Sequence, residues 1–370
     1  MARVVDLWHN RDRTRTSRYG TGQRWQAVWF EDGKPRKKSC PTKAAAEEHL
    51  VWVTHQQKTG AYVSADRGRV FVRDLLDAWM DAQVHLRAST AAAMRSDVRA
   101  TILPYWGDRV LADITKDDVQ RWVAGMGKAA RTVDTIHGRL NNFLSWCVDQ
   151  QRITVNPARG VNLPRGAKRE HQFLTVAQVR ALAEAIDGRY ADLVWLLATT
   201  GMRMGEACEL RWKDVDLRRR RLTVARAVVF VQGRPVVGPP KSGKPRTIPL
   251  TTMAASVLAE RRGTAGGDEL VFTTSRGMQV RANNFKRRHF DDAVARVNGV
   301  PDGARVPAGL WVHDLRHTAA SWAVQSGASV KSVQRMLGHA TAAMTLDVYA
   351  GLFDQDLDDV AVRLDALLAA

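Results

Sequence analysis

The chain has 370 residues, 45% of them hydrophobic and 25% charged, a composition that excludes a disordered protein and favours two or three folded domains. Lys and Arg outnumber Asp and Glu by 56 to 38 and give a formal charge of +18, which indicates a polyanionic partner. The basic residues are spread along the chain and not gathered in one amphipathic helix, and no apolar run is long enough to span a bilayer, so we expect binding to nucleic acid and not to a membrane. Residues 1–13 lack the apolar segment of a signal peptide, and the cysteines form no disulfide or metal framework. We therefore expect a cytoplasmic protein.

The first 60 residues have the pattern of a small sheet followed by a helix. Strand-forming residues run through 24–30, a second strand returns over 36–40, and residues 4–9 are a third candidate. Thr42 is placed to cap the helix that follows. The sequence therefore predicts a three-stranded sheet-plus-helix module over residues 1–60.

This module is basic, with twelve Lys and Arg against six Asp and Glu. A sheet with this charge would fit a DNA groove. The alternative interpretation is a solvated sheet face on a structural cap. The candidate DNA contacts are Arg24, Arg36, Lys37 and Lys38.

Residues 66–151 read as a compact helical domain. Apolar residues repeat at helical spacing in several stretches, and Thr115 with Asp118 forms a capping box before one of them. We expect the tryptophans of this region in the core and not stacked on bases. The repeating positions are Phe71, Leu75, Leu76 and Trp79; Met94, Val98 and Ile102; Val119, Trp122 and Val123; and Val133, Ile136, Leu140, Phe143 and Cys147.

Prolines and glycines interrupt this periodicity over residues 152–171, which we interpret as a basic linker able to cross a phosphate backbone, with Arg165 and Lys168 as candidate contacts. A last domain, 172–370, begins at Thr175, which is placed to cap a helix with Gln178 three residues on. Its helices alternate with a short antiparallel strand region. The expected fold class for the whole chain is α+β, mainly α.

Three segments of the last domain carry candidate chemistry. They are TGMRMGE at 200–206, PKSGKPRTIPL at 240–250, and HDLRHT at 313–318 followed by His339 and Tyr349. Taken singly, each has an ordinary structural interpretation. His313 and His317 could be a metal-binding pair at i, i+4, but no carboxylate lies between them as in HExxH, and we expect no metal site.

Together these segments resemble the tyrosine recombinase, or phage integrase, family. The pattern TGxRxxE, then PKxxxxRxIPL, then HxLRHT, then LGH ten residues before a tyrosine is specific, and it covers the whole last domain. The helical segment looks like the core-binding domain of the family. The first 60 residues resemble the arm-binding module of the larger integrases in layout and composition.

The resemblance implies site-specific DNA recombination through a 3′-phosphotyrosyl intermediate, for a phage or mobile element, without a cofactor. It places Arg203 and Arg316 as the catalytic arginines, Glu206 as the acid that supports Arg203, and Tyr349 as the nucleophile. The remaining implied catalytic residues are Lys241, His313 and His339.

The chemistry of these side chains agrees with such roles. Two guanidiniums can bind the non-bridging phosphate oxygens with fixed, paired hydrogen bonds. A phenol with a pKa near 10 is only about 0.1% ionised at neutral pH and needs a cationic, proton-accepting neighbourhood. Lys241 would protonate the leaving 5′-oxygen.

The implied partners are double-stranded attachment-site DNA, further copies of the chain in a tetramer, and an excisionase or a host DNA-bending factor, in the nucleoid of a bacterial host. Two alternatives remain open at this point. One is a type IB topoisomerase-like enzyme that relaxes DNA by the same chemistry, and the other is a non-catalytic DNA-binding regulator.

Overall fold

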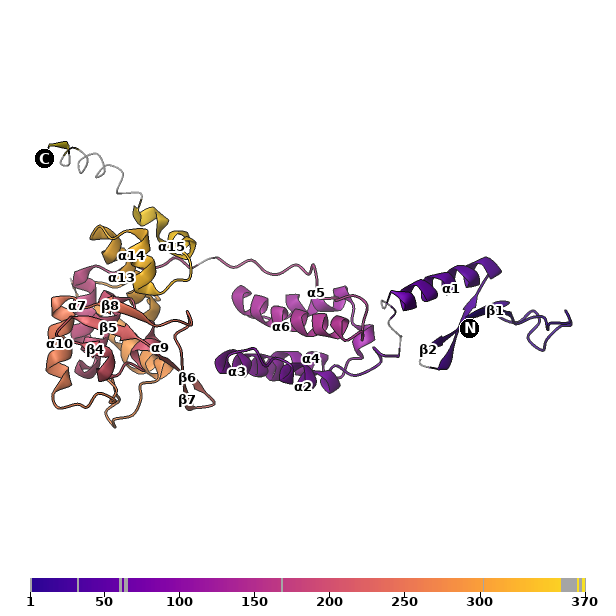
Figure 1. Cartoon of the computed structure of the whole chain (residues 1–370), viewed down its shortest axis with the longest axis horizontal. Helices are drawn as coiled ribbons and strands as arrows, with labels where there is room; N and C mark the ends of the chain where they lie inside the picture. The colour runs from indigo at the N-terminus through magenta and orange to yellow at the C-terminus, as the bar shows by residue number, and fades with distance from the viewer. Residues whose placement is uncertain are drawn as a thin grey trace. The chain divides into compact units, whose positions relative to one another are not determined.

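The computed structural model describes residues 2–31, 33–59, 62, 66–167, 169–301, 303–353, 365, 368 and 369. The chain divides into two compact units, Met1–Ala167 and Lys168–Ala370 (Figure 1). Helices account for 49% of the described residues and the sheets are small and antiparallel, so the predicted mainly helical α+β class is confirmed. In the part of the chain that is described, no helix has the length and apolar character to cross a membrane.

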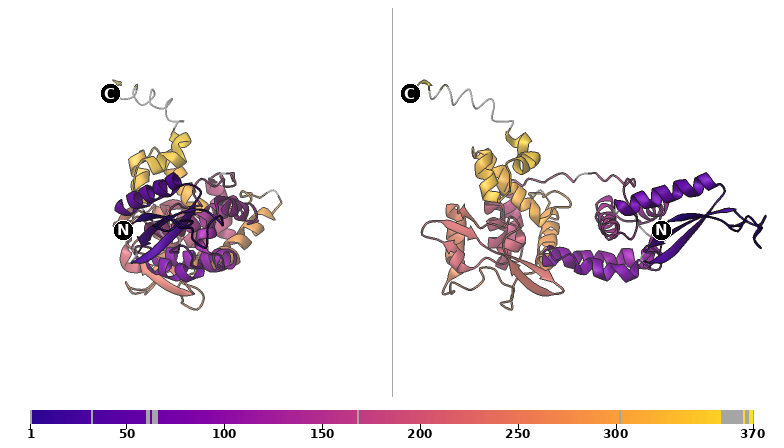
Figure 2. Two further views of the ribbon diagram at one scale, coloured as in Figure 1. Left: turned by 90° about the vertical axis from the view of Figure 1, so that its right-hand side faces the viewer. Right: turned by 45° about the vertical axis from the view of Figure 1, so that its right-hand side comes forward.

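The first unit opens with the predicted sheet and helix, which are β1 Arg3–Asp6, β2 Trp25–Glu31, β3 Lys34–Cys40 and α1 Lys43–Lys58. The strands pair in the order β1-β2-β3, and α1 packs along β2 and β3 (Figure 2). Thr42 caps α1, because its side chain accepts a hydrogen bond from the Ala45 amide at 3.1 Å. A small core lies between sheet and helix, formed by Ala27, Trp29, Cys40, Ala46 and Val53.

A helical core follows in the same unit. Its elements are α2 Arg73–Asp81, α3 Ala88–Asp97, the π-helical turn Val98–Ile102, α4 Leu103–Trp106, the 3-10 turn Leu111–Asp113, α5 Lys116–Ala124 and α6 Ala130–Asp149. Trp79 and Trp122 are buried in it, as predicted. Phe71 was expected on the buried face of α2, but it precedes the helix, bridges to Val110 and is 47% exposed. The helical spacing from Phe71 to Leu75 therefore does not place Phe71 in the helix.

Part of the predicted linker packs on this helical core. The Asn156 side-chain amide donates to the Asn141 carbonyl at 3.0 Å and to the Ser145 hydroxyl at 2.8 Å. The His137 ring lies 3.1 Å from the Ala158 carbonyl oxygen. These contacts attach the start of the linker to α6, and His137 gives the Ala158 carbonyl, which lies outside any helix, a polar partner.

The second unit surrounds one large apolar core. Its first elements are α7 Val176–Ala185, the 3-10 turn Gly188–Tyr190, α8 Ala191–Thr200, α9 Met204–Ala207, the 3-10 turn Trp212–Asp214, and the strands β4 Val215–Asp216, β5 Arg221–Val224, β6 Ala227–Val231, β7 Arg234–Gly238 and β8 Arg246–Pro249. The rest are α10 Thr252–Arg262, α11 Ala282–Phe285, the π-helical turn Lys286–Phe290, α12 Asp291–Asn298, α13 Val312–Gln325, α14 Val330–Leu337 and α15 Ala343–Phe353.

Two small sheets lie on this unit, a β4-β5-β8 sheet and a β6-β7 hairpin. Thr175 and Gln178 form the predicted capping box of α7. At the end of the chain α13 packs against α8, α14 and α15 (Figure 1). Because of this packing, motifs more than 100 residues apart in the sequence meet around α13.

The capping box of α5 gives a direct test of the helical core. The Thr115 hydroxyl accepts from the Asp118 amide at 3.2 Å, and the Asp118 carboxylate accepts from the Thr115 amide at 3.0 Å. Thr115→Ala should lower the opening free energy of α5 by about 1 kcal/mol, seen as roughly fivefold faster amide hydrogen exchange in that helix. Thr132→Ala, at an exposed position of α6, is the control. Unchanged exchange in α5 would show that the cap contributes nothing.

Candidate active site

A buried carboxylate joins the first and second motifs. The Glu206 side chain is 1% exposed, and its oxygens accept from the Arg203 guanidinium at 3.1 Å and from the Arg246 guanidinium at 3.0 and 2.7 Å. It also accepts from the Arg203 amide at 2.9 Å, which fixes the start of α9. Burial alone would raise the pKa of Glu206, but the hydrogen bonds and charges of Arg246 and Arg203 hold it below the ordinary value. Glu206 is therefore an anion at neutral pH.

Arg246 extends this link to the third motif. Its Nε donates to the Met336 carbonyl at the end of α14 at 2.9 Å. Arg246 belongs to the second motif, but no role was predicted for it. Its place in the pattern PKxxxxR was the sequence signal that could have identified it.

The second arginine of the site, Arg316, lies on α13 and is 3% exposed. Its guanidinium donates to the carbonyls of Gly201 at 2.6 Å and Leu337 at 2.7 Å. Gly201 ends α8 with φ +64°, and a Cβ there would lie 2.6 Å from Leu337, so a side chain is excluded on both grounds. Arg316 thus connects the ends of α8 and α14, and its neutral partners leave its positive charge available to an anion.

Two predicted histidines lie within reach of these charges. Burial, together with the charges of Arg316 and Arg203, lowers the pKa of His313 to about 4. Burial and the same two arginines lower the pKa of His339 to about 4. The His339 Nδ1 lies 3.0 Å from the Thr345 hydroxyl of α15. Both imidazoles are therefore neutral at pH 7.

The predicted nucleophile is fully enclosed. Tyr349, on α15, is 1% exposed, and its hydroxyl lies 2.8 Å from Nδ1 of His317. Burial raises the pKa of Tyr349 to about 12, against a smaller opposing effect of Arg316. The ionised fraction at pH 7 falls from about 10⁻³ to about 10⁻⁵. In the free chain the tyrosine is thus a protonated, sheltered phenol.

Lys241 differs from the other predicted residues in its surroundings. It lies on the exposed loop between β7 and β8, whereas Arg203, Glu206, His313, Arg316, His339 and Tyr349 gather around α13. The loop joins directly to Arg246, which is anchored in the cluster. The reach of the Lys241 side chain toward the cluster is therefore set by the conformation of this loop.

The start of α13 is fixed by a second ion pair that sequence reasoning missed. Asp314 is buried, accepts from the Trp311 amide at 2.7 Å and pairs with Arg169 at 2.5 Å. Burial alone would raise the pKa of Asp314, but the hydrogen bonds from Arg169 and Trp311 hold it below the ordinary value. Arg169 also lies over the Trp311 ring at 4.7 Å. This pair orients the turn of α13 that carries His313 and Arg316.

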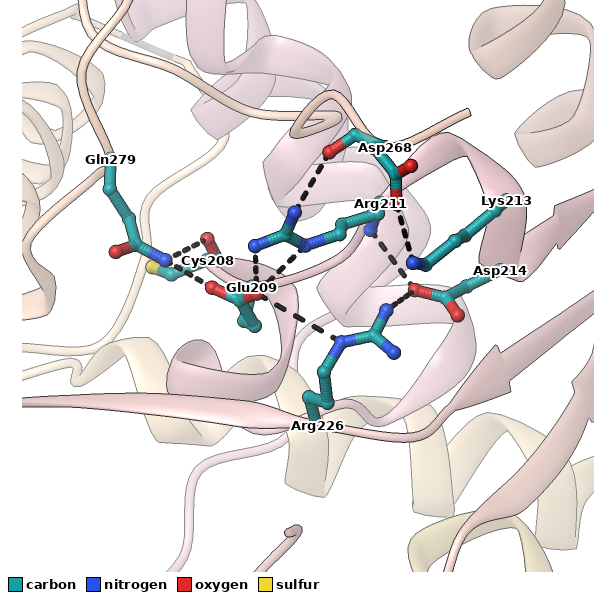
Figure 3. Close-up of polar contacts among 8 residues, drawn as sticks. All are labelled: Cys208, Glu209, Arg211, Lys213, Asp214, Arg226, Asp268 and Gln279. Carbon is teal, nitrogen blue, oxygen red and sulfur yellow. Dashed lines mark hydrogen bonds and ion pairs between the residues drawn. The ribbon is translucent and has the colours of Figure 1, made fainter. Parts of the chain in front are cut away.

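The segment after α9 is anchored by a separate network of charged groups (Figure 3). The Glu209 carboxylate, 1% exposed, accepts from the Arg211 guanidinium at 2.9 and 2.8 Å and from the Gln279 side chain at 2.5 Å. Arg226 pairs with Asp214 next to it. These contacts hold the segment that follows α9, while the bond from the Arg203 amide to Glu206 holds the start of the helix. Both ends of α9 are therefore fixed.

The predicted DNA contacts in the first unit fall into two groups. The Arg24 guanidinium donates twice to Asp6, at 3.0 and 2.9 Å, and Arg36 pairs with Glu31 at 2.8 Å. These two cations are paired within the module. Lys37 and Lys38 are exposed on β3.

Two further DNA contacts were predicted in the basic linker, at Arg165 and Lys168. Arg165 is exposed, and Lys168 lies outside the described residues. Within the described ranges, no three His, Cys, Asp or Glu side chains gather as they would to hold a metal ion.

Comparison with known proteins identifies this arrangement. The sequence model of the phage integrase family matches residues 172–356, half of the chain, and that of the phage integrase N-terminal SAM-like domain matches residues 71–127. The integrase of Mycobacterium phage D29 is 29% identical over 307 residues, which cover 80% of this chain and 79% of that protein.

Two solved structures share the fold. The Tn1549 transposon integrase in complex with a circular intermediate DNA has a TM-score of 0.67 at 20% identity, over 75% of this chain and 95% of that chain. A lambda integrase tetramer bound to a Holliday junction has a TM-score of 0.60 at 19% identity, over 85% and 93%. Fold and site together define a tyrosine-type recombinase. The chain belongs to the phage integrase family.

Because Glu206 joins two arginines, replacing it should lower the stability of the fold by an amount that depends on pH. Glu206→Gln should lower the free energy of unfolding by about 3 kcal/mol, because it leaves Arg203 and Arg246 beside an uncharged amide. The pKa of Glu206 is lowered on folding, so its contribution is present above the unfolded pKa of about 4.3 and is lost as pH falls through the folded pKa. The difference between wild type and variant in urea unfolding should therefore shrink at acid pH.

Glu184→Gln, at an exposed position of α7, is the matched control and should change stability by less than about 0.5 kcal/mol. A Glu206→Gln chain as stable as wild type at pH 7 would mean that the two arginines do not depend on this carboxylate.

Proposed function

We propose that this chain cuts and rejoins DNA at specific sites through a 3′-phosphotyrosyl intermediate formed by Tyr349, and so integrates and excises a phage or mobile element. The observation that carries the proposal is the convergence of Arg203, Arg316 and Tyr349 on one buried cluster. In that cluster three guanidiniums, those of Arg203, Arg246 and Arg316, face one carboxylate.

The charge of this cluster suits a phosphodiester. The four groups leave an excess of two positive charges, while the histidines are neutral. A phosphodiester carries one negative charge, and attack by a phenolate oxygen adds a second in the transition state. Fixed guanidiniums in a dry site stabilise such charge most where it develops, and each donor is worth roughly 10²–10³ in rate.

The steps follow from these positions. Arg203 and Arg316 bind the non-bridging oxygens, and the Tyr349 oxygen attacks phosphorus. The bond to the 5′-oxygen breaks, and Lys241 supplies the proton that this oxygen takes up. The 5′-hydroxyl of a second strand then reverses the reaction and releases the tyrosine. Since Tyr349 is buried in the free chain, the groups that cover its hydroxyl have to open before a phosphate reaches it.

The assembly is proposed by the same reasoning. Exchange between two duplexes needs four cuts, and the lambda integrase structure is a tetramer on a Holliday junction, so we infer a tetramer with one tyrosine per strand. The Tn1549 integrase structure contains DNA, which supports attachment-site DNA as the partner. The basic module over residues 1–60 would bind separate arm sites, and an excisionase or host bending factor would set direction.

One assay tests the activity against both alternatives. Supercoiled DNA with two candidate sites is incubated with the chain in EDTA, and recombinants, relaxed circles and shifted bands are scored. Wild type should give recombinants, whereas Tyr349→Phe should give shifted bands alone. Tyr190→Phe, a buried tyrosine elsewhere in the unit, is the control and should recombine. Relaxed circles without recombinants would favour the topoisomerase alternative, and shifted bands from wild type would favour the regulator.

The role of Lys241 has its own test. Lys241→Ala should slow single-turnover cleavage by at least about 10²-fold, because the 5′-oxygen leaves poorly without a proton. A substrate with sulfur at the 5′-bridging position should restore the rate, since a thiolate needs no proton. Lys244→Ala, in the same exposed loop, should cleave both substrates at the wild-type rate. A failure of sulfur to restore cleavage would remove Lys241 from the proton-donor role.

A further inference from the structure

His317 contacts the reacting atom of the proposed nucleophile but has no part in the set of residues assigned above. Its Nδ1 lies 2.8 Å from the Tyr349 hydroxyl, across 32 residues of sequence. His317 is 8% exposed and Tyr349 is 1% exposed, so water cannot replace either partner freely. A hydrogen bond between two buried polar groups is retained because breaking it leaves both unsatisfied.

We propose that His317 accepts the phenolic proton of Tyr349 during strand cleavage, and that it is a further catalytic residue of this enzyme. The inference rests on the proposed function, because it assumes that Tyr349 attacks the phosphate. It concerns the proton that this attack must release.

The surroundings of His317 keep its ring uncharged in the free chain. The charged and titratable groups that face it are His171, His313, Asp314, Arg316 and Tyr349. Burial lowers the pKa of His317 to about 3, with help from His171, His313 and Arg316 and against a smaller opposing effect of Asp314. The imidazole is therefore neutral and carries one nitrogen lone pair.

Ring packing fixes the orientation of the His317 imidazole. The His171 ring lies 4.1 Å from the His317 ring, and the His313 ring lies 5.1 Å away at 85°. Leu174 and Thr318 attach the segment that carries His171 to α13, since the Leu174 amide donates to the Thr318 hydroxyl at 3.0 Å. His317 is thus enclosed between two rings with Nδ1 directed at Tyr349.

Other groups in the cluster are engaged elsewhere. The His339 Nδ1 pairs with Thr345, and the Arg316 guanidinium donates to two carbonyls. His313 contacts His317 by its ring. Among the titratable groups that the structure describes here, His317 is the one hydrogen-bonded to the tyrosine oxygen.

The proton balance of the step is simple. As the Tyr349 oxygen bonds to phosphorus, its O–H bond breaks and the proton moves to Nδ1 of His317, giving an imidazolium. The phosphate between the arginines carries the negative charge that stabilises this imidazolium. The 5′-oxygen leaves with a proton from Lys241. On religation the tyrosine oxygen is the leaving group, and the same proton returns to it from His317.

The test replaces the base while keeping the hydrogen bond. In His317→Asn the side-chain oxygen can take the place of Nδ1 as an acceptor but cannot hold the proton. Single-turnover covalent attachment to a nicked suicide substrate should slow by about 10²–10⁴-fold, with DNA affinity unchanged. His289→Asn is the matched control, because His289 packs on a tyrosine, Tyr190, at 4.7 Å in the same unit but outside the cluster.

A more acidic phenol separates proton transfer from positioning. 3,5-Difluorotyrosine at position 349 ionises more readily than tyrosine. Its introduction should raise the cleavage rate of the His317→Asn chain by a factor at least roughly tenfold larger than the factor by which it raises the wild-type rate. A positioning role predicts near-wild-type cleavage by His317→Asn and no selective recovery, and either result would overturn the proposal. Adduct formation by Tyr349→Phe would instead overturn the proposed function.

A measurement without any change at His317 covers the case in which the variant does not fold. In ¹⁵N-histidine NMR of the full chain, the His317 signal, assigned by its shift in Tyr349→Phe, should show an unprotonated Nδ1 and a protonated Nε2. A protonated Nδ1 would mean that His317 donates to Tyr349, and it would then be unable to receive the proton.

Discussion

The active cluster depends on one buried anion, the carboxylate of Glu206. A carboxylate with 1% exposure is costly to desolvate, and here its oxygens accept bonds from Arg203, from Arg246 and from a backbone amide. The same Arg246 also donates to Met336, so α9, β8 and α14 are fixed to one point. On the proposed function, the arginines that bind the phosphate are therefore positioned before DNA arrives, which is the condition under which fixed donors stabilise a transition state most.

Burial has a second consequence, because it shifts the pKa values of the tyrosine and of the histidines of the cluster. It raises the pKa of Tyr349 to about 12 and lowers those of His313 and His339 to about 4. A phosphate anion between the arginines would oppose the histidine shifts and would also repel a phenolate that formed too early. Proton transfer coupled to attack avoids that repulsion, since free phenolate never accumulates. On the proposed function, the free chain accordingly holds its tyrosine protonated until a phosphate is bound.

The features that the sequence predicted correctly are those that depend on neighbouring residues. The capping boxes at Thr115 and Thr175 and the apolar stripes of α5 and α6 depend on residues within a few positions, and the structure has them. Sequence reasoning missed contacts between distant segments. The pairing of His317 with Tyr349 spans 32 residues and that of Arg169 with Asp314 spans 145, and neither follows from periodicity or composition. The motif spacing located the catalytic candidates because it reflects such contacts without showing them, and their roles remain predictions.

The same limit applies to charge. The net +18 indicates a polyanionic partner, but it counts every cation alike. Arg24 and Arg36 are paired with carboxylates in the first module, and Arg211 is paired with Glu209 beside α9. Cations already neutralised inside the protein displace few counterions from DNA, so the exposed Lys37 and Lys38 should contribute more to affinity and to its salt dependence than the arginines beside them. Arg24 and Arg36 instead hold the first module together, and Arg211 holds the segment after α9 in the second unit. The net charge thus sums cations that stabilise the fold and cations that are exposed on the surface.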